Sequence, residues 1–470
     1  MTLLVAGYWL CAGAMADDST PPRPAGWLWT CDGQTRFVRL RAISEAGEFA
    51  FQSATLDAAS GPSPRALAPL SMDNNASAAP AESFTLPLEE LDRWGSWPRA
   101  AAGLQVELRA GGRIIGSLVK WTDQRVRMDL AADGGEINLP QSAIARFIWQ
   151  PDVWNTWQRH HPTLRVPDTA AAFSSSSAEP GGDAATAPDD ITSKTSDSVL
   201  VANKPIEQDQ VWFINGDVQS GTVTDWRDRT IFLQTAAGEL ALETVNLVAV
   251  EFAPSRFAAP AADLAEIPPG TKFWIGLTDG TRVLAGLPRA TPAGFELPLE
   301  QGGFMSASAA ALCAIQPLHP RVRYLSDLPG SYKHVPWLTQ SWDYQRDRNV
   351  LGGSLLSGGV AAVKGLGLHS AARLTYVLPD HCLAFAAEVG IDDATAGGGE
   401  VICRIYGDAG TGEWRLLRVT PIVRGGDAPL PVRVDLTGQK RLSLLVDYGR
   451  EGGALDHADW LNARVIVAAP

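Results

Sequence analysis

The stretch VELRAGGRIIGSLVKWTDQRVRMDLAADGGEINLPQSAIARFIW, residues 106–149, is the part of the sequence that decides the fold. Residues 211–252, VWFINGDVQSGTVTDWRDRTIFLQTAAGELALETVNLVAVEF, present the same features in the same order: a short strand, a turn, a strand with a Gly near its start and a Trp near its end, an alternating strand, a Gly turn and a final apolar strand. In the first copy, Val126, Met128 and Leu130 share one face of a period-two pattern, which is typical of a half-buried β-strand. We therefore expect two copies of one small β-unit.

Two weaker copies lie within residues 27–94 and 273–315. Each has an Asp-Gly dipeptide, at 32–33 and 279–280, which supplies the positive φ that a tight hairpin requires. Short strands need their edges covered, so four such copies favour small SH3-like or Sm-like β-barrel repeats.

Two segments, 54–83 and 162–204, interrupt the folded sequence. Both are rich in Ala, Ser, Pro and Asp and bury too little apolar surface to offset the entropy of ordering, so we expect them to be mobile. The predicted domains are a signal peptide at 1–16, small β-barrel repeats at 26–97 (with the mobile insert 54–83), 103–158, 205–256 and 268–318, a disordered linker at 162–204 and a β-sandwich at 322–470.

The first residues, MTLLVAGYWLCAGAMADD, contain an apolar run that is too short to span a bilayer and that ends in the small-x-small pattern Ala14-Met15-Ala16. This pattern is typical of a secretory signal peptide, and the alternative is a buried N-terminal strand. We therefore expect a protein that is secreted or held in the periplasm or cell envelope, with no membrane span. A formal net charge of -13, without clustered Lys and Arg, argues against a nucleic-acid partner.

The sequence changes character near Leu325, where longer alternating strands begin and continue, between Gly- and Asp-rich loops, to the C-terminus. In RLTYVL, residues 373–378, for example, Leu374, Tyr376 and Leu378 face one way. So many antiparallel candidates in one segment predict a two-sheet β-sandwich or jelly roll, and the whole chain is predicted to be all-β.

Six motifs follow one another across nearly all of residues 325–467. They are YLSDL, WDYQRDRNVLGG, KGLGLHSAARLTYVL, AFAAEVGIDDATAGGGEVICRIYGD, VRVDLTGQKRLSLLVDYG and DHADWLNARV. In this order they resemble the NPCBM family of carbohydrate-binding modules. The resemblance implies a galactose-binding-like β-sandwich, whose characterised relatives bind galactose-containing glycans and are often attached to glycoside hydrolases. One departure is Asp408-Ala409-Gly410, where the family often reads Asp-Gly.

Sugar binding in water requires an aromatic face against the C–H patches of a pyranose and polar groups that bond to neighbouring hydroxyls. Side chains of these types stand near the predicted strand ends, where the loops of a sandwich gather. The carbohydrate-binding candidates are His369, Asp393, Arg404, Asp456, His457 and Trp460. Two of them have structural alternatives: His369 as a turn residue bonded to the backbone, and Trp460 as packing under the closing strand.

Asp392 and Asp408 are the metal candidates, for a structural calcium ion. Asp392 and Asp393 precede the glycine-rich segment ATAGGGE, so these carboxylates either ligate calcium or only initiate a turn. The loop lacks the Asp-x-Asp-x-Asp-Gly order of an EF-hand, and calcium rests on analogy with related sandwiches. No catalytic residue and no other cofactor is predicted.

The predicted function is that of an exported, noncatalytic protein that binds galactose-like glycans through its C-terminal sandwich. The N-terminal barrels are interpreted as spacers or protein-interaction modules, in which the recurring Trp121 and Trp226 form exposed platforms or pack inside. A glycosidase is not predicted, because no catalytic motif appears and small repeats and linkers occupy the rest of the chain. The alternative is a structural or interaction protein of the cell envelope without sugar affinity.

Overall fold

The computed structural model describes most of the chain. The described residues are 25–44, 47–54, 82–98, 100–109, 111–122, 124–132, 135–160, 207–253, 271–291, 294–300, 302–335, 341–450 and 452–469. The predicted signal peptide, the linker and nearly all of the mobile insert lie outside these ranges. Within them the chain is almost entirely antiparallel β-structure with one α-helix, α1 (Pro151–His160), so the all-β prediction is confirmed. No helix of the described residues is long and apolar enough to cross a membrane.

Four small β-units precede the sandwich. Unit 1 contains β1 (Ala25–Thr30), β2 (Thr35–Ile43), β3 (Glu48–Ser53), β4 (Ser83–Pro87) and β5 (Leu91–Gly95). Unit 2 contains β6 (Leu104–Leu108), β7 (Arg113–Trp121), β8 (Arg125–Leu130), β9 (Glu136–Pro140) and β10 (Ile144–Ile148). Unit 3 contains β11 (Asp209–Phe213), β12 (Val218–Arg227), β13 (Thr230–Thr235), β14 (Gly238–Glu243) and β15 (Leu247–Glu251). Unit 4 contains β16 (Lys272–Leu277), β17 (Arg282–Ala285), β18 (Arg289–Thr291), β19 (Gly294–Pro298), β20 (Phe304–Ala307) and β21 (Leu312–Leu318).

Units 1 to 3 share one topology. Their strands pair in the spatial order fourth, third, second, first, fifth, and a short 3-10 turn joins the fourth strand to the fifth. Unit 4 follows the same plan with its second strand divided into β17 and β18. In the described part of each unit the fourth and fifth strands do not pair, so the units are open arrays rather than closed barrels. The domain boundaries given above remain our proposal.

The sequence signals explain these elements locally. Residues of β8 alternate between exposed and buried, as the period-two pattern of the sequence predicts. Gly33 and Gly280, in the two Asp-Gly turns, have φ of 93° and 89°, a conformation that favours glycine. Trp121 and Trp226 pack against each other with ring centroids 6.2 Å apart, so they join the core between units 2 and 3.

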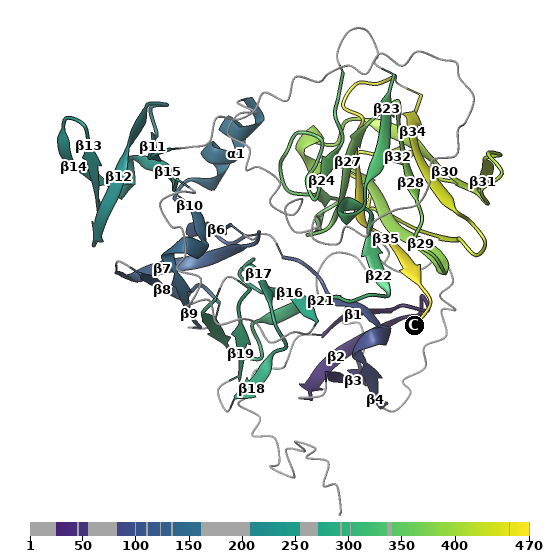
Figure 1. Ribbon diagram of the computed structural model, residues 1–470, viewed down its shortest axis with the longest axis horizontal. Coiled ribbons are helices and arrows are strands. Elements are labelled where there is room, and N and C mark those ends of the chain that lie inside the picture. The colour runs from purple at the N-terminus through teal and green to yellow at the C-terminus, as the bar shows by residue number, and fades with distance from the viewer. Residues whose placement is uncertain are drawn as a thin grey trace, which may run out of the picture.

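The units do not follow one another in space as they do in the sequence. Unit 1 pairs with unit 4 through their fifth and last strands, β5 and β21, and unit 2 pairs with unit 3 through β10 and β15. Unit 4 pairs with unit 2 through β20 and β9. Each is the fourth strand of its unit when β17 and β18 are counted as one strand. The spatial order is therefore 1, 4, 2, 3, with unit 3 at one end (Figure 1).

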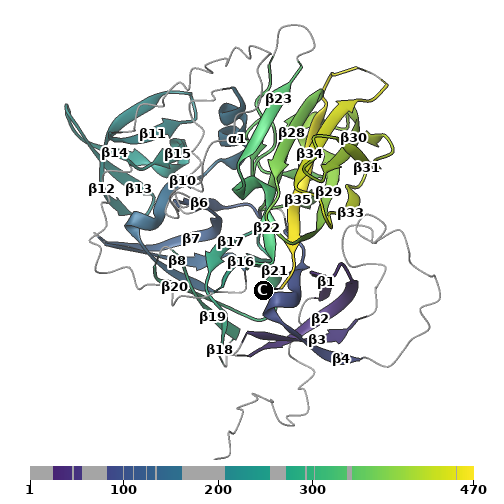
Figure 2. The ribbon, with the colours of Figure 1, turned by 45° about the vertical axis from the view of Figure 1, so that its right-hand side comes forward.

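The C-terminal segment forms an antiparallel two-sheet sandwich, as predicted, beside the four units (Figure 2). The first sheet contains β24 (Gln345–Arg346), β27 (Gly365–His369), β35 (His457–Val467), β29 (Cys382–Ile391) and β33 (Leu430–Asp435) in spatial order, with β22 (Val322–Tyr324) also on β35. The second contains β23 (Gly330–His334), β28 (Ala372–Val377), β34 (Arg441–Tyr448), β30 (Glu400–Asp408) and β31 (Arg415–Val419), with β32 (Val423–Arg424) also on β30. A hairpin of β25 (Leu356–Ser357) and β26 (Val360–Ala361) lies outside both sheets. Apolar side chains between the sheets form the core.

Unit 1 and the sandwich share a buried, charged interface. On β5, Arg93 forms an ion pair with Glu388 of β29, with Arg93 Nη1 lying 3.0 Å from Glu388 Oε2. The neighbouring Asp92 pairs with Arg464 of β35, and all four side chains are buried. The Arg93 guanidinium also lies 4.1 Å from the centre of the Trp29 ring. Because a buried charge without its partner is costly, these pairs hold unit 1 against the sandwich in one arrangement.

Candidate carbohydrate-binding site

One end of the sandwich gathers three histidines from three strands. His334 ends β23, His369 ends β27 and His457 begins β35. The antiparallel register of β27 and β35 places His369 directly opposite His457. Trp342, in the segment before β24, lies against these rings. We call these four residues the imidazole patch.

The rings of the imidazole patch are in contact. The Trp342 indole lies parallel to the His369 imidazole, with centroids 4.8 Å apart and planes inclined by 4°. The His457 ring lies 5.5 Å from that of Trp342 and 5.6 Å from that of His369. His334 meets His369 edge-on, and His334 Nδ1 accepts a hydrogen bond from the backbone N–H of Trp342 at 3.3 Å. Trp342 and His334 are partly exposed while His369 and His457 are buried, so solvent reaches the patch at Trp342 and His334.

The two buried imidazoles are neutral at physiological pH. Burial lowers the pKa of His369, an effect that its hydrogen bond to Ser370 O partly offsets. Burial, with the neighbouring His369, lowers the pKa of His457 to about 4. Nδ1 of His457 is buried and has no hydrogen-bond partner among the described residues. A neutral imidazole has one donor and one acceptor nitrogen, and His369 Nδ1 donates to Ser370 O, so His369 Nε2 is the nitrogen that can accept a hydrogen bond from a hydroxyl group.

Asp456 supports the imidazole patch through Ser370. Its Oδ2 accepts the Ser370 hydroxyl at 2.6 Å, and its Oδ1 accepts the Glu400 N–H at 3.1 Å. Ser370 O in turn accepts His334 Nε2 at 3.1 Å and lies 2.5 Å from His369 Nδ1. Asp456 is fully buried, and burial raises its pKa to about 6. The carboxyl therefore positions the histidines and has no exposed oxygen to offer a ligand.

Two other candidates lie outside the patch. Arg404 is on the outer face of β30, between the core residues Cys403 and Ile405, and its guanidinium pairs with Asp447. Trp460 has no exposed surface and packs in the core, with its ring 6.0 Å from that of Phe385. A side chain without exposed surface offers no face to a ligand, so the packing interpretation of Trp460 is the one that its position supports.

Asp393 holds the β25–β26 hairpin in place. Its Oδ1 accepts the Gly358 N–H at 2.7 Å, and its Oδ2 accepts the Gly359 N–H at 3.0 Å. Both carboxylate oxygens thus fix the turn of another hairpin, while Asp392 accepts the Ala394 N–H in the turn that follows the two aspartates.

The two metal candidates do not lie together. Asp408 ends β30, at the opposite end from the imidazole patch, where its carboxylate pairs with Arg441 and accepts backbone N–H groups of the turn that follows, including that of Gly410 at 3.0 Å. Asp392 lies at the patch end, where it donates its own N–H to His457 O at 2.8 Å. The length of β30, roughly 26 Å at about 3.3 Å per residue, separates the two carboxylates.

Asp392 instead pairs with the carboxyl group of Asp459. Both are buried, and burial together with the Asp392 carboxylate raises the pKa of Asp459 well above its usual value. Asp392 Oδ1 accepts the Ala394 N–H at 2.8 Å and Oδ2 accepts Asn349 Nδ2 at 3.1 Å. Calcium binds six to eight oxygens, and the described residues contain no group of three His, Cys, Asp or Glu side chains that could hold a metal ion. Asp392 and Asp408 therefore do not ligate the same calcium ion.

Sequence reasoning missed His334, Trp342 and the pairing of the Asp459 carboxyl group with that of Asp392. The aromatic residue of the motif WDYQRD was a usable signal for Trp342, since an indole beside polar residues in a predicted loop is an ordinary sugar platform. His334 and Asp459 carried no such signal, because their roles depend on which strands are neighbours.

Comparison with known proteins identifies the class of the C-terminal domain. Residues 321–466 match the NPCBM/NEW2 domain family, so the sandwich resembles the domains of that family. A protein of Renibacterium salmoninarum, provisionally named endo-alpha-N-acetylgalactosaminidase, is 34% identical over 119 residues, which are 25% of this chain and 8% of that protein. The chain thus spans a small part of this relative.

Two solved structures from Clostridium perfringens are similar over part of the chain. One is a CBM51 module of a GH95 protein in complex with methyl-galactose; it is 25% identical, covers 31% of this chain and 99% of that chain, and has a TM-score of 0.27. The other contains the CBM51-2 and INT domains of ZmpB in complex with GlcNAc; it is 24% identical, covers 40% of this chain and 42% of that chain, and has a TM-score of 0.28.

Proposed function

We propose that this protein is an exported, noncatalytic glycan-binding protein whose imidazole patch contacts a galactose-like sugar. The observation that carries the proposal is the partly exposed Trp342 stacked on neutral, buried histidines at one end of a sandwich that resembles NPCBM/NEW2 domains. Secretion or retention in the periplasm or cell envelope belongs to the same proposal, and it rests on the N-terminal sequence pattern.

The chemistry of the patch suits an uncharged, hydroxyl-rich ligand. An indole offers a flat apolar surface to the C–H face of a pyranose, and neutral imidazoles form hydrogen bonds with hydroxyls without the desolvation cost of a charge. His369 and His457 supply these polar atoms, while Asp456 and Ser370 hold them in place. A galactose-like ligand is preferred because of the family resemblance.

A noncatalytic role is supported by the state of the carboxyls. Hydrolysis of a glycoside uses two carboxyl groups that flank the scissile bond. At the patch end, Asp456 is fully buried and both of its oxygens accept hydrogen bonds from Ser370 and Glu400. It is therefore poorly placed to act as an acid or a base on a bound sugar.

The four units serve as a scaffold in this proposal. They contact one another through strand pairs, and unit 1 contacts the sandwich through buried ion pairs, so they fix the position of the sandwich rather than acting as loosely jointed spacers. The domain boundaries of the sequence prediction are kept within this proposal.

The test is a glycan array with the full chain, followed by calorimetry with each sugar that binds, including galactose. The full chain is used because unit 1 covers charged residues of the sandwich. We expect Trp342→Ala and His369→Ala each to weaken binding at least about tenfold. Trp414→Ala is the matched control, since Trp414 is another partly exposed tryptophan of the sandwich and lies between the guanidinium groups of Arg373 and Arg441.

The outcomes separate the alternatives. Binding that survives Trp342→Ala but not Trp414→Ala would move the site away from the imidazole patch. If the wild-type chain binds no glycan on the array, the glycan-binding proposal fails, and an envelope interaction protein without sugar affinity becomes the better reading.

A further inference from the structure

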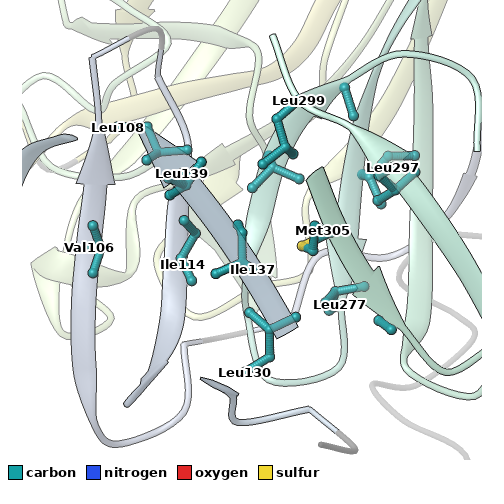
Figure 3. Close-up of a cluster of buried hydrophobic side chains, with 14 of the residues drawn as sticks. Val106, Leu108, Ile114, Leu130, Ile137, Leu139, Leu277, Leu297, Leu299 and Met305 are labelled. Atoms are coloured by element: carbon teal, nitrogen blue, oxygen red, sulfur yellow. The ribbon is translucent and has the colours of Figure 1, made fainter. Parts of the chain in front are cut away.

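The junction between units 2 and 4 brings equivalent positions together. Ile137 of β9 lies opposite Met305 of β20 in the antiparallel pair. These two residues hold equivalent places in their units. Ile137 lies opposite Met128 of β8, the third strand of unit 2, and Met305 lies opposite Leu297 of β19, the third strand of unit 4. The backbone pattern of the junction is therefore two-fold symmetric. Both side chains are fully buried, and Figure 3 shows them side by side where the apolar residues of the two units meet.

Unit 3 presents the same position without a partner. Leu240 of β14 lies opposite Leu233 of its third strand, as Ile137 lies opposite Met128. Among the described residues β14 pairs only with β13, and Leu240 is 39% exposed. Figure 1 shows β14 at the margin of the molecule, away from the sandwich. A position that is buried in one unit and exposed in another indicates an edge that can accept a further strand.

The backbone of β14 is oriented for such pairing. Thr244, just after the strand, donates its N–H to Arg229 O across the β13–β14 pair. Backbone groups of successive residues point to opposite sides of a strand, so those of Leu240 face β13. The N–H and C=O groups of Glu239 and Ala241 consequently face the open edge.

We propose that β14 pairs with β14 of a second copy of this chain and so repeats the junction between β9 and β20. In that register Leu240 faces the partner's Leu240, and Glu239 faces the partner's Ala241, with both backbone hydrogen bonds exchanged in each such pair. No carboxylate stands directly opposite another. The other open fourth strand, β4, is less suited, because the Arg36 guanidinium lies 5.1 Å from the ring of Phe84, which holds the equivalent position.

The proposed dimer is weak and depends on concentration. One short strand on each side buries less area than a standard stable interface. The two Glu239 side chains lie diagonally across the symmetry axis, so they repel each other at low ionic strength. Added salt screens this repulsion and strengthens the dimer, which distinguishes it from an association held by ion pairs.

The first experiment is a cross-link on the symmetry axis. The Cα atoms of a non-hydrogen-bonded antiparallel pair are about 4.5 Å apart, a separation that a disulfide can span. Cys11 is replaced by Ser in every variant, so that this native cysteine does not form cross-links. We expect Leu240→Cys to form a covalent dimer on mild oxidation at least about tenfold faster than Val377→Cys. Val377 is an apolar residue of the sandwich that is more exposed than Leu240, at 75%. Equal rates for the two variants would overturn the proposal.

The second experiment is sedimentation velocity of the full chain over a series of concentrations. Ala241→Pro removes an N–H that β13 does not use, and Leu240→Lys places like charges on the axis. We expect each change to weaken the dimer at least about tenfold, while Val377→Lys has no effect. Circular-dichroism melts check that every variant is folded. A dimer that persists in both β14 variants, or a wild-type chain that is monomeric at every concentration, would overturn the proposal.

Discussion

The buried ion pair between unit 1 and the sandwich gives the sharpest prediction of stability. Glu388 is 7% exposed and accepts hydrogen bonds from Arg93 Nη1 at 3.0 Å and from Asn462 Nδ2 at 3.1 Å. Burial alone would raise the pKa of Glu388, but Arg93 and Arg464 hold that pKa below its usual value. The ionised carboxylate is thus matched to two buried guanidinium groups. We predict that Glu388→Gln, which removes this charge and keeps the size, strongly destabilises the chain.

The expected magnitude follows from what the substitution leaves behind. Removing one member of a buried ion pair costs about 3–5 kcal/mol, because the other charge stays buried without compensation. The control is Asp447→Asn, which removes the carboxylate from the partly exposed pair with Arg404 on the same domain. A pair with that exposure contributes at most about 1 kcal/mol.

The assay is urea unfolding of the full chain, followed by tryptophan fluorescence and by circular dichroism. We expect Glu388→Gln to lower the free energy of unfolding by about 3 kcal/mol or more, and Arg93→Met/Glu388→Leu to recover much of this loss, since an apolar pair leaves no unpaired charge. If Glu388→Gln costs no more than Asp447→Asn, the contact between unit 1 and the sandwich is not buried in solution and the reasoning fails.

Three further predictions concern the sandwich. Below about pH 6.5 the unfolded chain protonates His457, whereas the folded chain does not until about pH 4, so His457 lowers the free energy of unfolding as the pH falls through this window. Asp456 takes its proton near pH 6 in the folded chain and near 3.8 in the unfolded chain, so it raises the free energy of unfolding as the pH falls. The free energy of unfolding of His457→Gln, minus that of the wild type, should therefore rise by roughly 3 kcal/mol as the pH falls from 6.5 to 4 in urea titrations. A difference between the two proteins that does not change with pH would refute these pKa shifts. Trp460→Ala should lower the free energy of unfolding by about 3–5 kcal/mol, whereas a loss of sugar affinity with unchanged stability would make the residue a ligand platform after all. Asp393→Ala should cost about 1–3 kcal/mol by freeing the Gly358 N–H, with sugar affinity unchanged in calorimetry.

The strands could be predicted from the sequence because their signal is local. Side chains alternate across a strand whatever its neighbours are, so a segment such as 125–130 reveals its buried face by itself. The pairing of β9 with β20 could not be predicted, because any exposed strand edge can accept another and the choice depends on the whole assembly. The open arrays differ from the expected barrels for the same reason, since the fifth strands of all four units and the fourth strands of units 2 and 4 pair with strands of other units.

The candidate site divides in a similar way. His369 and His457 could be proposed because both stand at strand ends in motifs of the resemblance. Trp342 lies in a loop, and its contact with His369 depends on the path of that loop. Asp92 and Arg93 look like ordinary polar residues of a short strand, and only the docking of the sandwich buries them. Trp460 could be named but not given a role, because a large aromatic side chain near a strand start suits a core and a binding surface equally well.

The spatial order of the units also determines when each part of the chain can finish folding during synthesis. Units 2 and 3 are neighbours in the sequence, so their shared strand pair can form early. Unit 1 is made first, but its last strand, β5, pairs with β21 of unit 4, and its charges wait for Glu388 and Arg464. Contacts of such long sequence separation form slowly, so β5 stays open on one edge until unit 4 has been made, and Asp92 and Arg93 stay unpaired until the sandwich has left the ribosome. The first unit to be made is thus the last to be completed.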